Sequence, residues 1–222
     1  HFDWETKYIP LELQKQWAQM GVGTPSVISI SFGGFWLATS SGNYGFRGKL
    51  PSLSPSEFIK LESQLKLESV EERWIYGDSM GGHNVWQLAL RYPEFFSKVA
   101  TSCSAQMSVS PFQYPYQFGT YAAQSGGWVS WILGATALFR SFYETEAIWL
   151  QESPLALLTD FKPPSSTHYM VMAVTDDVYG FTLPNRTIYE ALYAKGALID
   201  YSEVRASHCF LPVEPLAKFL SP

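Results

Sequence analysis

Apolar positions fall into short runs separated by longer stretches with helical spacing. The short runs predict buried strands over residues 27–31, 74–76, 98–103, 169–174 and 198–204. The longer stretches predict helices over residues 11–20, 54–71, 79–92, 185–195 and 212–220. Strand and helix alternate, which predicts an α/β fold with a mostly parallel, doubly wound sheet.

Two regions depart from this alternation. The first two dozen residues leave room for at most one strand, near residues 2–9, so the N-terminal edge of the sheet is expected to be trimmed. Residues 105–165 lack strand patterns and concentrate Trp, Tyr and Phe. We predict one domain over residues 1–222, with residues 105–165 as an aromatic-rich helical cap. Its aromatic side chains form either a satellite core or the lining of a pocket, and the two are compatible.

Composition limits the partners of the chain. The 222 residues suffice for one domain with a full core, and the net charge of −5 comes without a basic stripe. A nucleic-acid partner is therefore not expected. The longest apolar run, residues 128–139, is shorter than the roughly 20 residues of a membrane span. No ligand spacing for zinc and no phosphate-binding glycine loop occurs, so no metal or cofactor is expected.

The first residue is His1 rather than Met, as expected after removal of a secretory signal or trimming of the chain. A secreted or periplasmic location is one expectation, and a cytoplasmic location stays open. The oligomeric state stays open as well.

The sequence Gly-Asp-Ser-Met-Gly at residues 77–81 lies between a predicted strand and a predicted helix. A serine on such a sharp turn is exposed and backed by the N-terminus of the helix, whose free N–H groups suit an oxyanion. Ser79 is the candidate nucleophile, and the N–H of Met80 is one candidate oxyanion donor. Glycine is expected to be required at Gly77 and Gly81 because neighbouring backbone approaches too closely there to leave room for a Cβ. A chance glycine-serine turn is the alternative.

The stretch Gly-Asp-Ser-Met-Gly-Gly-His-Asn, followed by Leu-Arg-Tyr-Pro-Glu-Phe-Phe, resembles the α/β-hydrolase superfamily. Within it, the chain resembles the Putative esterase family, which includes S-formylglutathione hydrolases, feruloyl esterases and mycolyltransferases. The resemblance covers most of the chain from about Pro25 onward, except the middle insert. It implies the α/β-hydrolase fold and a catalytic triad in the order Ser, Asp or Glu, His.

In this order, His208 is the expected base because it alone lies between the last predicted strand and the last predicted helix. The acid should follow the strand that ends at residue 174. Asp176 is favoured, with Asp177 and then Asp160 as alternatives. Adjacent carboxylates on an extended chain point opposite ways, so only one of Asp176 and Asp177 can face the base.

The resemblance also implies a second oxyanion donor after Gly33, from the N–H of Gly34 or of Phe35. Phe35, Trp128 and Trp131 are the expected substrate-binding residues. The sequence thus predicts a serine carboxylesterase that acts on a small-molecule ester. An acyltransferase using the same triad, or a hydrolase fold kept as a binding module, is the alternative.

Overall fold

The computed structural model describes residues 2–30, 54–67, 70–113, 116–208, 210 and 212–222. Its strands are β1 (Trp74–Asp78), β2 (Lys98–Ser102), β3 (His168–Asp176) and β4 (Leu198–Ser207). Its helices are α1 (Phe2–Met20), α2 (Pro55–Gln64), α3 (Ser79–Arg91), α4 (Tyr116–Ser125), α5 (Val129–Tyr143), α6 (Glu146–Glu152), α7 (Pro154–Leu157), α8 (Thr182–Ala194) and α9 (Val213–Phe219). None of the helices in these described stretches combines the length and apolarity needed to cross a membrane.

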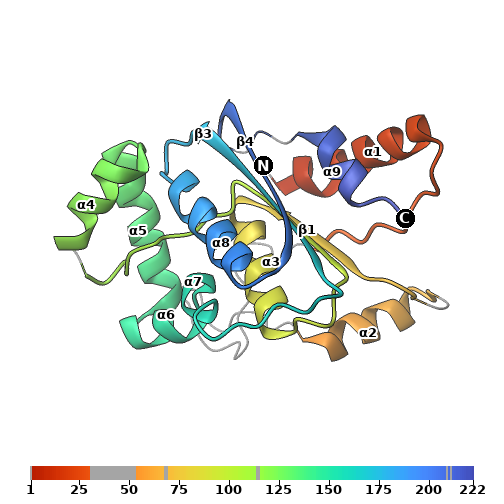
Figure 1. Cartoon of the computed structure of the whole chain (residues 1–222), viewed down its shortest axis with the longest axis horizontal. Coiled ribbons are helices and arrows are strands. Elements are labelled where there is room, and N and C mark those ends of the chain that lie inside the picture. Colours follow the sequence, from red (N-terminus) through yellow and green to blue (C-terminus); the bar gives the residue numbers. More distant parts are fainter. Residues whose placement is uncertain (1, 31–53, 68–69, 114–115, 209, 211) are drawn as a thin grey trace.

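The four strands form one parallel sheet in the order β1-β2-β3-β4. Alternate residues of β3 face opposite sides of it. Tyr169 and Val171 pack in a core with α3 and α8, whereas Met170 and Met172 pack with α1 and α9. Helices therefore cover both faces of the sheet, and α1 and α9 lie together at one side of it (Figure 1). The prediction of a parallel, doubly wound α/β fold is confirmed.

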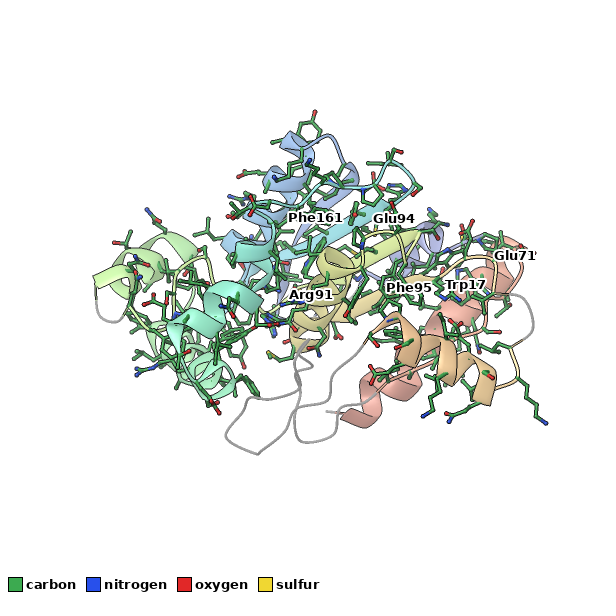
Figure 2. All side chains as sticks on the ribbon, turned by 90° about the horizontal axis from the view of Figure 1, so that it is seen from below. Trp17, Glu71, Arg91, Glu94, Phe95 and Phe161 are labelled. Atoms are coloured by element: carbon green, nitrogen blue, oxygen red, sulfur yellow. The ribbon has the colours of Figure 1, made fainter. Side chains whose placement is uncertain are left out.

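The N-terminal region differs from its prediction. Residues 2–9, where a strand was possible, belong to α1, which continues through Pro10. Ile9, Leu13 and Trp17 recur every four residues and are buried on one face of this helix. Trp17 also donates a hydrogen bond from Nε1 to the carbonyl of Ala217, at 2.9 Å (Figure 2 labels Trp17). Packing against α9 thus stabilises a helix where a strand was considered.

The strand predicted over residues 27–31 is wrong for the part that is described. Residues 27–30 form neither strand nor helix, and Val27, Ile28 and Ile30 are about 40% exposed. A β-branched run forms a stable strand when it buries one face, and the apolar side chains of this run stay about 40% exposed in the described part of the chain.

The insert between β2 and β3 consists of α4, α5, α6 and α7. Its buried aromatic residues form a core of their own: Tyr121, Phe139, Phe142, Tyr143 and Trp149. Phe181 and the side chain of Met80 also pack in this core. Helices α4 and α5 stand to one side of the sheet, away from α1 and α9 (Figure 1).

Candidate active site

Ser79 begins α3 directly after β1, in a left-handed backbone conformation with φ of +47°. Such a conformation costs a non-glycine residue roughly 1–3 kcal/mol, so the surrounding structure must hold it in place. A Cβ on Gly77 would lie 2.4 Å from the carbonyl carbon and oxygen of Gly81. The strained serine and the close approach behind it produce the sharp strand-to-helix turn that the motif predicts.

The glycine requirement differs from the prediction at one position. Among the residues that the structure describes, a Cβ on Gly81 would meet nothing nearer than a side-chain oxygen of Asp78 at 3.9 Å. A Cβ on Gly82 would lie 2.8 Å from the Cβ of Ser104, where α3 crosses the end of β2. Gly77 and Gly82, rather than Gly77 and Gly81, are therefore the positions that space restricts.

His208 lies one residue beyond β4 and reaches the turn after β1. Its Nε2 is 2.9 Å from Oγ of Ser79, and its Nδ1 is 2.8 Å from Oδ2 of Asp177. The carboxylate of Asp177 accepts from Nδ1–H, which leaves Nε2 free to accept the serine proton. The carboxyl ends of β1, β3 and β4 thus bring together a hydroxyl, an imidazole and a carboxylate.

Asp177, not Asp176, contacts His208. The side chain of Asp176 is 59% exposed and lies 3.7 Å from Nε of Arg205, whereas that of Asp177 is 1% exposed. An irregularity between β3 and β4 also affects the level at which His208 lies. Val174 pairs with Val204 but Asp176 pairs with Ser207, so β4 advances three residues while β3 advances two. One further step sets His208 level with Asp177. Asp160, the third candidate, is exposed before β3.

Aromatic side chains enclose the imidazole of His208. The rings of Tyr179 and Phe181 lie 4.8 and 5.7 Å from it, and both are tilted by 65°. The backbone N–H of Tyr179 also donates to Oδ1 of Asp177, at 2.9 Å. The carboxylate therefore has one oxygen on the backbone and the other on the imidazole, which fixes its orientation.

The expected oxyanion donors fall in two parts of the chain. The N–H of Met80 belongs to the first turn of α3, where N–H groups have no acceptor within the helix. Gly34 and Phe35 lie outside the described residues, so the predictions for them stay predictions.

The two predicted substrate-binding tryptophans stand apart from the core of the insert. Trp128 is 64% exposed and Trp131 46% exposed, at the start of α5. The rings of Trp131 and Tyr179 form a T-shaped contact with centroids 5.2 Å apart. Trp131 is thus joined to His208 through one intervening ring, whereas the side chain of Trp128 projects further toward solvent.

A row of polar side chains on α3, which the sequence analysis missed, attaches the insert to the nucleophile helix. His83 contacts the carbonyl of Ala105 through Nδ1 at 2.8 Å and the hydroxyl of Tyr143 through Nε2 at 2.5 Å. Burial lowers the pKa of His83 to about 4, so the ring is neutral. Gln87 donates to Tyr143 at 3.1 Å.

Arg91, at the end of the same row, pairs with Glu152 and lies beside the insert helices (Figure 2). Polar residues at positions i, i+4 and i+8 of an otherwise apolar helix are the signal that could have revealed this row.

Asn185 connects two loops of the site from within α8. It is fully buried, and its Nδ2 donates to the carbonyl of Ser104 at 2.8 Å and to that of Phe181 at 2.7 Å. The sequence Asn-Arg-Thr at residues 185–187 matches the acceptor pattern for glycosylation. Because its Nδ2 is buried and makes both hydrogen bonds, this nitrogen is not accessible for glycosylation in the folded protein.

The parallel sheet, the strand-to-helix turn at Ser79 and the placement of His208 after the last strand define an α/β-hydrolase fold. A family model described as Putative esterase matches residues 58–176, more than half of the 222 residues. The chain therefore belongs to the Putative esterase family. No curated protein sequence matches it.

Solved structures with this fold are similar over most of the chain. The S-formylglutathione hydrolase of Agrobacterium tumefaciens shares 16% identity, with a TM-score of 0.55, over 93% of this chain and 73% of its own. The Francisella virulence factor BioJ shares 15% identity, with a TM-score of 0.55, over 74% and 56%. Esterase B of Lactobacillus rhamnosis shares 14%, with a TM-score of 0.51, over 78% and 59%. The chain thus spans little more than half the length of the latter two.

Proposed function

We propose that the protein hydrolyses carboxylic esters, with Ser79 as nucleophile, His208 as general base and Asp177 as the orienting acid. The observation that carries the proposal is the unbroken chain of two short contacts, 2.9 Å from Ser79 to His208 and 2.8 Å from His208 to Asp177. Membership of the Putative esterase family supports the same reaction.

In the first half of the reaction, Oγ of Ser79 attacks the carbonyl carbon of the ester and its proton passes to Nε2 of His208. The buried carboxylate of Asp177 stabilises the resulting imidazolium through Nδ1–H. The tetrahedral intermediate then collapses, the bond from carbon to the leaving oxygen breaks, and His208 returns the proton to the departing alcohol. An acyl group remains on Ser79.

In the second half, a water molecule takes the place of the alcohol. His208 removes one proton from it while its oxygen attacks the acyl carbon, and the bond to Oγ of Ser79 breaks as the proton returns to the serine. The products are a carboxylic acid and the free enzyme. An alcohol acceptor in place of water would give acyl transfer through the same steps.

We assign the hydrogen bonds that stabilise the oxyanion of each tetrahedral intermediate to the N–H of Met80 together with the N–H of Gly34 or Phe35. The position of Met80 at the positive end of α3 supports the first donor. Each such donor contributes about 3 kcal/mol to transition-state stabilisation in other serine enzymes.

We propose medium-chain acyl esters or aryl esters as the substrate class. Tyr179 and Phe181 present rings beside His208, and Trp131 extends this surface by packing on Tyr179. Large rigid apolar faces suit an acyl chain or an aryl group. Trp128 and Phe35 are proposed to extend this surface. The insert over residues 105–165 would then serve both as a cap with its own core and as one wall of the substrate site.

The test is hydrolysis of p-nitrophenyl esters from acetate to octanoate, together with methyl ferulate. The wild-type protein should turn over several of them, and Ser79→Ala should lower kcat by at least about 1000-fold while keeping the melting temperature. Ser97→Ala, on a serine at the opposite end of the sheet, is the matched control and should keep full activity. Unimpaired hydrolysis by Ser79→Ala would refute the proposal. Stable folding without any turnover would favour a binding module.

A further inference from the structure

The turn that carries Asp177, residues 177–181 between β3 and α8, is called the acid turn here. Within it, the N–H of Gly180 donates to the carbonyl of Asp177 at 3.0 Å, and Gly180 has φ of +74°. The N–H of Tyr179 donates to the carboxylate of Asp177. The orientation of this carboxylate therefore depends on the backbone path of the whole turn.

The insert contacts the backbone of the acid turn. The hydroxyl of Tyr121, on α4, donates to the carbonyl of Gly180 at 3.0 Å. The backbone N–H of Trp128 donates to the carbonyl of Val178 at 2.8 Å. Between them, a Cβ on Gly127 would lie 2.6 Å from the nitrogen of Gly180, so the backbone of the insert directly contacts the backbone of the acid turn. One short segment of the insert thus meets the acid turn at three points.

The side chain of Tyr121 has two distinct surroundings. Its ring belongs to the aromatic core of the insert and the residue is 1% exposed, while its hydroxyl leaves that core to reach Gly180. Burial, with a smaller contribution from the charge of Asp177, raises the pKa of Tyr121 well above its usual range. The hydroxyl therefore keeps its proton and acts as a donor. Packing of the core alone would be served equally by phenylalanine, so the hydroxyl needs another explanation.

We infer that Tyr121 is a positioning residue for Asp177: by holding the carbonyl of Gly180 it fixes the acid turn, and thereby the carboxylate that orients His208. This inference rests on the proposed function. It makes the insert a part of the catalytic apparatus in addition to a cover, because an element more than fifty residues away in the sequence sets the geometry of the acid.

The test is a double-mutant cycle on hydrolysis of p-nitrophenyl butyrate. Tyr121→Phe removes only the hydroxyl and should lower kcat about tenfold in the wild-type background. In the Asp177→Asn background the same change should lower kcat by less than about twofold, because the group that Tyr121 positions no longer acts. A role in packing alone would lower kcat by the same factor in both backgrounds.

Two further variants sharpen the cycle. Tyr143→Phe removes another buried hydroxyl of the same core, which contacts His83 and Gln87 on α3. Its effect should be equal in both Asp177 backgrounds. Gly127→Ala displaces the acid turn through Gly180 by a different contact, and its effect should again depend on Asp177.

The outcomes separate this inference from the proposed function. Hydrolysis that depends on Ser79, together with equal effects of Tyr121→Phe and Gly127→Ala in both backgrounds, overturns the role of Tyr121 alone. Full activity of Tyr121→Phe in the wild-type background does the same. Absence of any Ser79-dependent hydrolysis overturns the proposed function and this inference with it.

Discussion

The turn that carries Ser79 and the turn that carries Asp177 are built in contrasting ways. Residues 77–82, the nucleophile turn, are shaped mainly by their own backbone and the adjoining end of β2, with Gly77 against Gly81 and the carbonyl of Ser79 accepting from the N–H of Ala105 at 2.8 Å. The acid turn takes its outer support from a distant insert, through Tyr121 and Trp128. A local motif can encode the first, whereas the second needs the assembled fold.

The largest expected effect concerns the choice of acid. Asp177→Asn should lower kcat by about 10,000-fold, since an amide in this position disfavours the tautomer of His208 that accepts the serine proton. Asp176→Asn should change kcat by less than about threefold because that side chain is exposed beside Arg205. Kinetics on p-nitrophenyl butyrate measure both effects. Reversed effects of the two variants would show that the wrong aspartate is assigned as the acid.

Substitution of its glycines tests the geometry of the nucleophile turn. Gly77→Ala places a Cβ 2.4 Å from backbone atoms of Gly81, which cannot yield as a side chain would. We expect a loss of about 3 kcal/mol or more in the free energy of unfolding, as for strong overpacking. Gly81→Ala is the matched control inside α3, and it should be neutral or stabilise by up to about 1 kcal/mol. Urea denaturation measures both; equal losses would contradict the geometry.

His83 tests the attachment of the nucleophile helix to the insert. Its folded-state pKa of about 4 lies below the ordinary value of 6.5, so the unfolded chain binds more protons between these two pH values. Stability is therefore fully present above pH 6.5 and falls as the pH drops toward 4. We expect a loss of about 2 kcal/mol between pH 7 and pH 5 from this group. His83→Asn should reduce that slope, and an unchanged slope in urea denaturation would refute the assignment.

The smallest expected effect concerns chain-length preference. Trp131→Ala should lower the ratio of kcat/KM for octanoate over acetate esters by about three- to tenfold, because its ring continues the surface formed by Tyr179. Trp128→Ala, more exposed and without that ring contact in the described residues, should change the ratio by less than about twofold. Melting temperatures recorded beside the kinetics show whether either variant loses stability instead. A stable Trp131→Ala protein with unchanged preference would leave the insert as a structural cap.

The same contrast explains how far the sequence could predict the site. The contact between Ser79 and His208 was predictable, because the turn chemistry lies within a few residues of Ser79 and His208 lies between the last strand and the last helix. The contact of His208 with Asp177 was not predictable, since the extra residue by which β4 advances past β3 moves His208 from the level of Val178 to that of Asp177. No local pattern around residues 176 and 177 encodes an irregularity that lies in the partner strand.

The sheet and its helices were predictable in outline, and the failures have a common physical origin. Hydrophobic periodicity indicated all four strands of the described sheet and the helices that pack on them. It misassigned residues 2–9 and 27–30, where the secondary structure depends on what the segment packs against: α9 in the first case, and no strand within the described residues in the second. The contacts of Tyr121 with the acid turn likewise depend on distant packing.

The most direct test of the central claim, that His208 and Asp177 activate Ser79, is the rate at which a fluorophosphonate labels the protein, with the site mapped by mass spectrometry. We predict a single adduct on Ser79, formed at similar rates in the wild-type and Asp176→Asn proteins and about 1000-fold or more slower in Asp177→Asn and His208→Ala. Labelling at another residue, or a rate that Asp177→Asn leaves unchanged, would contradict the account.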